Sequence, residues 1–163
     1  RATAARRLMM MSDEFASEAE LSGIERVYDY EDNSPGLGHL RRRIDDALLE
    51  ELRGADSKLV RGMADLIAVA QGDMTLDPTD LEENLSAGNA NVLVVLALTK
   101  AKRTDAKALI YYRSVAKQLE QDKEQQLESA SLMYRLLRPL AGDEITALRS
   151  EMRKAFGVEI LAN

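Results

Sequence analysis

The chain has 163 residues, 45% of them hydrophobic, and 22 Lys and Arg against 28 Asp and Glu give it a formal net charge of −6. It contains no cysteine and one histidine, which excludes disulfides, thiol nucleophiles, thiolate metal sites and metal sites built from two histidines. The apolar content excludes a disordered chain, and the acidic balance argues against nucleic acid as the main partner, because phosphate contacts need an excess of basic residues.

The N-terminal part of the chain carries most of the negative charge. Apolar residues recur at steps of three and four from Leu8 to Ala19, which predicts an amphipathic helix. Residues 13–32 hold eight acidic residues and one basic residue, a local charge of 1 − 8 = −7. We interpret residues 1–34 as a segment that could be mobile and that forms either a solvated face or a docking surface for a basic partner. The candidate partner-binding residues in it are Asp13, Glu14, Glu18, Glu20, Asp29, Glu31 and Asp32.

The middle of the chain is predicted to form a series of shorter helices. Apolar stripes cover residues 40–52 and 60–70, and Gly54 and Gly72 follow them as helix-ending residues. Asp56 or Ser57 can cap the second of these helices. The pair Asp77-Pro78 indicates a further helix start, because proline at the first helical position loses no hydrogen bond.

The run Val92–Leu98 is the longest uninterrupted apolar stretch. Its valines favour a strand, but no second alternating run exists to pair with it, and an unpaired strand would bury unsatisfied backbone groups. We therefore predict a fully buried helix. Seven apolar residues are also far fewer than the roughly twenty that a membrane span needs, so we expect no membrane span.

The longest helical pattern covers Ala106–Leu137, without glycine or proline inside it. It predicts one helix of about thirty residues, roughly 45 Å long, which would overhang a small domain or meet a partner, including a second copy of the chain. Its centre, Glu120–Gln126, has no apolar residue, and a polar stretch within an apolar stripe can specify a partner. The candidate partner-binding residues of this helix are Tyr111, Glu120, Glu124 and Gln125.

A last helix is predicted from Asp143 to Gly157, followed by an apolar tail. Together the patterns predict an all-α fold, an irregular bundle of about seven helices that forms a single domain over residues 1–163. They contain no convincing strand and no internal repeat of fixed period.

The search for catalytic and cofactor-binding patterns finds none. His39, the one imidazole, lies beside a glycine loop and three arginines, which favours an exposed residue over a general base. The acidic loops that begin at Asp29 and Asp73 lack the glycine and the final glutamate that an EF-hand requires. We therefore expect no metal, no cofactor and no enzymatic activity.

The function that these observations favour is that of a non-catalytic assembly or adaptor protein. It would bind helices of protein partners through apolar stripes and through its acidic N-terminal face. A ligand-binding or enzymatic bundle that uses paired carboxylates is an alternative, because such pairs have no sequence signature. We expect a soluble chain in the cytoplasm, with secretion as the alternative.

One short stretch resembles a known family. The residues Met11-Ser12-Asp13-Glu14-Phe15-Ala16-Ser17 are similar to the Ser-Asp-Glu-Met-Ala stretch of gatekeeper proteins of bacterial type III secretion, with Phe15 in place of methionine. The resemblance covers seven of 163 residues. It implies an all-α, non-enzymatic protein that binds secretion chaperones or export machinery, or a chaperone-bound or structural subunit of such a system.

Overall fold

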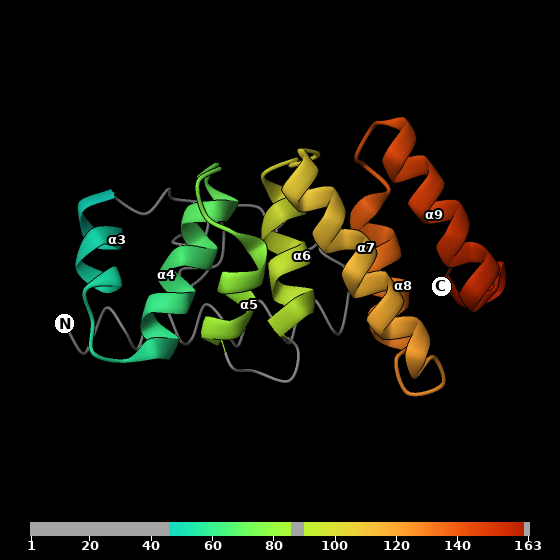
Figure 1. The fold of residues 1–163 in the computed structure, drawn as a ribbon, viewed down its shortest axis with the longest axis horizontal. Helices are drawn as coiled ribbons and strands as arrows, with labels where there is room; N and C mark the ends of the chain where they lie inside the picture. Colours follow the sequence, from blue (N-terminus) through green and yellow to red (C-terminus); the bar gives the residue numbers. More distant parts are fainter. Residues whose placement is uncertain (1–45, 86–89, 162–163) are drawn as a thin grey trace, which may run out of the picture.

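The computed structural model describes residues 46–85 and 90–161, and every regular element within them is α-helical (Figure 1). This confirms the predicted all-α class for the described part of the chain. That part holds seven helices of eight residues or more and a final single turn. They are α3 (Asp46–Arg53), α4 (Lys58–Ala70), α5 (Pro78–Leu85), α6 (Ala90–Lys100), α7 (Ala106–Gln121), α8 (Leu127–Leu137), α9 (Asp143–Phe156) and α10 (Val158–Leu161).

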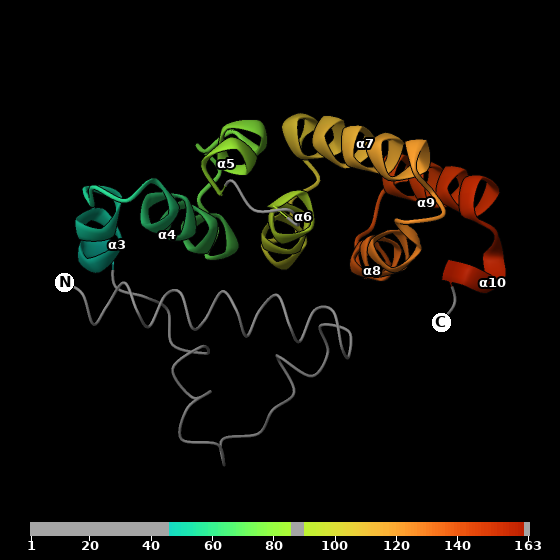
Figure 2. The ribbon, with the colours of Figure 1, turned by 90° about the horizontal axis from the view of Figure 1, so that it is seen from below.

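The helices pack in two rows. From α4 onward, each helix contacts the next helix and the next but one. Seen from below, α4, α6 and α8 form one row and α5, α7 and α9 form the other, while α3 packs against α4 at one end (Figure 2). Each helix therefore buries one face against its own row and another against the opposite row. This arrangement extends the described part of the chain along one axis, as in stacked helical repeats (Figure 1).

The helix boundaries follow the predicted signals. The side chain of Ser57 caps α4 by accepting a hydrogen bond from the backbone N–H of Val60, and α5 begins at Pro78. Gly72, with a φ of 107°, follows α4 in a conformation that favours glycine. A further cap that was not predicted is Asp105, whose side chain accepts from the N–H of Ala108 at the start of α7.

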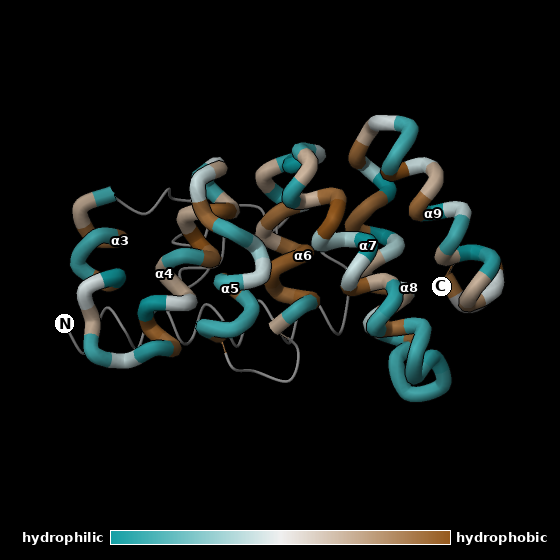
Figure 3. Tube along the Cα trace, in the orientation of Figure 1, coloured by the Kyte–Doolittle hydropathy of each residue, from teal (hydrophilic) through white to brown (hydrophobic). Residues whose placement is uncertain are grey.

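The buried apolar side chains of α3 to α10 form one continuous cluster. α6 is its centre, because every residue from Val92 to Thr99 is buried. Figure 3 shows α6 as a mostly hydrophobic tube between more mixed neighbours. The prediction of a fully buried helix over Val92–Leu98 is therefore confirmed.

The prediction of one long helix over Ala106–Leu137 is wrong. α7 ends at Gln121 and α8 begins at Leu127, and a turn joins the two helices. In this turn the backbone N–H groups of Gln125 and Gln126 both donate to the carbonyl of Asp122, at 3.1 Å each. The polar stretch is thus a connection between two helices and not the middle of one.

Burial of the second apolar stripe explains the break. α7 packs against α5, α6 and α9, whereas α8 packs against α6, α9 and α10. In a continuous helix the residues of α8 would lie beyond the end of these neighbours, so Met133 and Leu137, which are at most 1% exposed, would face water. Each such side chain contributes about 2 kcal/mol when buried, and the buried side chains of α8 together outweigh the few helical hydrogen bonds, worth about 1 kcal/mol each, that the turn gives up.

Several predictions fall outside the described residues. The helix predicted from Leu8 to Ala19 lies there, as does the acidic segment of residues 1–34. The single domain over residues 1–163 stays a prediction for the same reason. Within the described helices, none combines the length with the hydropathy that crossing a lipid bilayer requires.

Candidate functional site

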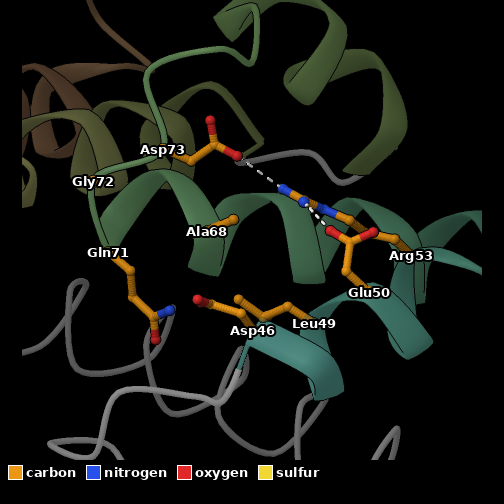
Figure 4. A pocket seen from close by; sticks show the side chains of 8 residues that line it. All are labelled: Asp46, Leu49, Glu50, Arg53, Ala68, Gln71, Gly72 and Asp73. Carbon is orange, nitrogen blue, oxygen red and sulfur yellow. Dashed lines mark hydrogen bonds and ion pairs between the residues drawn. The ribbon is translucent and has the colours of Figure 1, made fainter.

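A cleft of about 300 Å³ opens between α3 and the C-terminal end of α4. Leu49 and Ala68 supply its apolar wall, and charged or amide side chains supply most of the rest (Figure 4). Its lining residues are Asp46, Leu49, Glu50, Arg53, Ala68, Gln71, Gly72 and Asp73.

Arg53 organises the charges of this cleft. Its guanidinium group donates to Glu50 Oε1 at 2.6 Å, to Asp65 Oδ1 at 2.8 Å and to Asp73 Oδ2 at 3.1 Å. Two of these ion pairs, to Glu50 and Asp73, are drawn in Figure 4. Because the three carboxylates belong to α3, α4 and the loop after α4, Arg53 ties these elements together. Burial lowers the pKa of Arg53, but the three carboxylates raise it by more, so Arg53 is permanently charged.

The carboxylate of Asp73 is also committed to the structure. It accepts hydrogen bonds from the hydroxyl group of Thr75 at 2.6 Å and from the backbone N–H of Thr75 at 2.8 Å. These bonds, with the Arg53 contact, lower the pKa of Asp73 against the opposing effect of burial. An ionised, fully hydrogen-bonded carboxylate is a poor general base at neutral pH. The ion pairs of Arg53 with Glu50, Asp65 and Asp73 therefore hold α3 to α4.

A second polar cluster lies inside the molecule where α7 begins. Arg103, with a side chain 1% exposed, forms a two-point contact with Asp105 through Nε at 2.8 Å and Nη2 at 3.1 Å. Its Nη1 donates to the carbonyl of Leu76 at 3.4 Å, and its own carbonyl accepts from the hydroxyl group of Tyr112 at 3.0 Å. Hydrogen bonds from Arg103 outweigh burial and lower the pKa of Asp105. This cluster therefore fixes the connection between α6 and α7.

Tyr111, a predicted partner-binding residue, is buried within the chain. Its ring is 5% exposed, and its hydroxyl group donates to Glu82 Oε2 on α5 at 2.7 Å. Burial first, and then the carboxylate of Glu82, raise the pKa of Tyr111 well above its usual range. Tyr111 therefore joins α7 to α5 and does not stand on the surface. A sequence signal for this was available, because Tyr111 stands three and four residues from Ala108 and Val115, which are buried on the same side of α7.

The other predicted residues of this region, Glu120, Glu124 and Gln125, lie together at the end of the α7–α8 hairpin. All three are exposed, and residues 120–125 are exposed without interruption. We call residues 120–126 the hairpin tip. Figure 3 shows it as an entirely hydrophilic loop that extends beyond the neighbouring helices. The tip contains three carboxylates and one lysine, a local charge of 1 − 3 = −2.

The remaining candidates lie outside the described residues. They are Asp13, Glu14, Glu18, Glu20, Asp29, Glu31 and Asp32, together with His39 and the stretch that resembles type III secretion gatekeepers. Among the residues that the structure describes, no group of three or more His, Cys, Asp or Glu side chains could hold a metal ion.

Comparison with known proteins adds no assignment. No protein-family model, no curated protein and no solved structure matches the chain.

Proposed function

We propose that the chain is a non-catalytic helical module for protein–protein interaction or assembly. The observation that carries the proposal is the hairpin tip, a stretch of polar residues that is exposed from 120 to 125 and is held at the end of two helices whose apolar faces are buried. Elongated arrays of paired helices offer partners extended surfaces, which supports the same interpretation.

The surface that a partner would meet is polar. The apolar stripes of the described helices are used in the chain's own core, so they are unavailable to partner helices. The large apolar side chains that stay exposed come from different elements: Leu48, Leu59, Met74, Ile110 and Val158. Single exposed apolar residues are common on any surface and need no partner. The proposal therefore assigns the main contact to charged and amide groups.

The charge of the hairpin tip favours a basic partner. Glu120 lies in the last turn of α7 and Glu124 lies in the connection to α8, and both side chains are exposed. Complementary charge of this kind speeds association and helps a partner dock in one orientation. The acidic segment of residues 13–32 also carries negative charge. A basic partner is therefore expected for both the hairpin tip and this segment.

Charge reversal at the hairpin tip tests this function. The double variant Glu120→Lys and Glu124→Lys should reduce the amount of partner that co-purifies with the chain from its native source by at least about tenfold, because two attractive contacts become repulsive. The matched control Asp80→Lys and Glu151→Lys changes the charge equally at exposed positions on α5 and α9, and it should retain the partner. The proposal is wrong if both variants retain the same proteins in the same amounts while thermal melting shows both to be folded.

A further inference from the structure

A basic cluster on α8 and α9 has no assigned role. The guanidinium carbons of Arg149 and Arg153 lie 5.3 Å and 5.4 Å from the centre of the Tyr134 ring. Arg149 and Arg153 are one helical turn apart on α9, and Tyr134 lies on α8. Two cations thus share one aromatic ring, which attracts each of them but does not neutralise either.

The cluster lacks a counter-ion. Within the described part of the chain, no carboxylate lies within ion-pair distance of Arg149 or Arg153, although Arg53 has three such partners and Arg103 and Arg113 have one each. Like charges at this helical spacing destabilise a helix by a few tenths of a kcal/mol. The shared aromatic ring offsets this repulsion but leaves both positive charges without an anion.

The cluster also contains buried donors that nothing accepts. Tyr134 is 4% exposed, and neither its O–H nor the Nε–H of Arg149 meets an acceptor, while the guanidinium groups of Arg149 and Arg153 approach the phenol oxygen as donors. Most buried polar groups in proteins are paired, so two such atoms beside each other indicate a missing acceptor. Burial raises the pKa of Tyr134, but the nearby guanidinium groups of Arg149 and Arg153 lower it by more. The local potential around the hydroxyl group is therefore positive.

We propose that Tyr134, Arg149 and Arg153 form a binding site for a phosphoryl group, as free phosphate or as a phosphate monoester. A phosphoryl group carries about −1.5 to −2 charges at neutral pH and three acceptor oxygens. A phosphoryl group therefore matches two guanidinium groups and one phenol donor better than a carboxylate group does, because a carboxylate has only two oxygens and one charge. Arg153 is exposed and Arg149 is half-buried, so an anion reaches the guanidinium groups from solvent. This site is separate from the hairpin tip, and the two proposals stand independently.

Titration of the intact chain with inorganic phosphate tests the site, with sodium acetate at equal ionic strength as the carboxylate arm and phenyl phosphate as the monoester arm. In 15N NMR spectra, the side-chain Nε–Hε signal of Arg149 should shift with saturable phosphate dependence and show little response to acetate. Equal binding of phosphate and phenyl phosphate indicates a monoester site that leaves one oxygen free. Binding of phosphate alone indicates a site for the free ion.

Substitutions locate the site. The double variant Arg149→Gln and Arg153→Gln should raise the dissociation constant for phosphate by at least about tenfold, and Tyr134→Phe should raise it several-fold, because charge-assisted hydrogen bonds are lost. The control Arg138→Gln and Lys154→Gln removes the same charge from exposed positions on the same part of the molecule and should change binding less than twofold. The site is disproved if the wild-type Arg149 signal does not respond to phosphate, or if the control weakens binding as much as the double variant. The phosphate titration of the wild-type chain needs no variant, so misfolding of a substituted chain does not obscure its result.

Discussion

Individual buried polar residues determine how the two rows of helices join. Arg103 is the clearest example, since its buried guanidinium group is held by Asp105 and by the carbonyl of Leu76, which precedes α5. A buried charge is tolerated only when its partners are in place, because desolvation costs several kcal/mol for each unpaired ion. Nothing in the sequence marked this arginine, which stands in a short run of basic residues that is typical of an exposed loop. The polar contacts of such a residue depend on three-dimensional neighbours that spacing does not reveal.

We predict that Asp105→Ala destabilises the chain by about 3–5 kcal/mol, since it leaves the Arg103 charge buried without its carboxylate. The same change removes the side-chain cap of α7. Asp105→Asn keeps an acceptor for the N–H of Ala108 and should cost less. Urea unfolding followed by circular dichroism measures both variants. A loss below about 1 kcal/mol for Asp105→Ala would show that Arg103 finds another partner or reaches solvent.

At the scale of elements, the sequence was a good guide to helix type and ends and a poor guide to helix continuity. Ser57, Pro78 and Gly72 marked real boundaries because caps and breakers act locally. The break between α7 and α8 has no glycine or proline. It is set by where apolar surface can be buried, which is a property of the neighbouring helices. The absence of any apolar residue from Glu120 to Gln126 was the one sequence signal for this break. The prediction missed the break because it followed helical periodicity alone.

Distance measurement tests the α7–α8 hairpin. The chain has no native cysteine, so spin labels can be attached to Lys107→Cys and Arg138→Cys without further changes. A continuous helix would separate these backbone positions by about 46 Å, whereas two antiparallel helices keep them within about 25 Å. Double electron–electron resonance spectroscopy of the two spin labels should give the shorter distance. The pair Lys107→Cys and Gln121→Cys, both on α7, serves as an internal standard at about 21 Å.

Close contact between α4 and α5 depends on Gly62. A Cβ atom at this position would lie 3.1 Å from the backbone carbon and oxygen of Asn84, whereas one at Gly54 would meet nothing closer than 3.5 Å. We predict that Gly62→Ala lowers the free energy of unfolding by about 1–2 kcal/mol, because the backbone displacement outweighs the helical preference for alanine. Gly54→Ala should be neutral or slightly stabilising. The account of this contact fails if thermal unfolding shows Gly62→Ala to be the more stable of the two.

At the scale of the whole molecule, the described helices form an all-α bundle, as predicted, and they are ordered in two rows. The all-α class followed from apolar periodicity, which is a sum over many residues and tolerates local errors. The two-row order could not be predicted from that periodicity, because it depends on which helix faces pack together. Several helices have apolar stripes of similar width, so the stripes do not identify their packing partners. The same order places the hairpin tip at the exposed end of α7 and α8. There Glu120, Glu124 and Gln125 can contact a partner together.

The central claim is that the hairpin tip contacts a protein partner. Its most direct test is a photo-crosslinking amino acid at Gln125 in cells of the native source, with the exposed Thr79 of α5 as the matched control position. The account predicts a specific cross-linked protein from Gln125 that is absent from Thr79 and is lost when Glu120 and Glu124 are changed to lysine. Cross-links from Thr79 but none from Gln125 would contradict it.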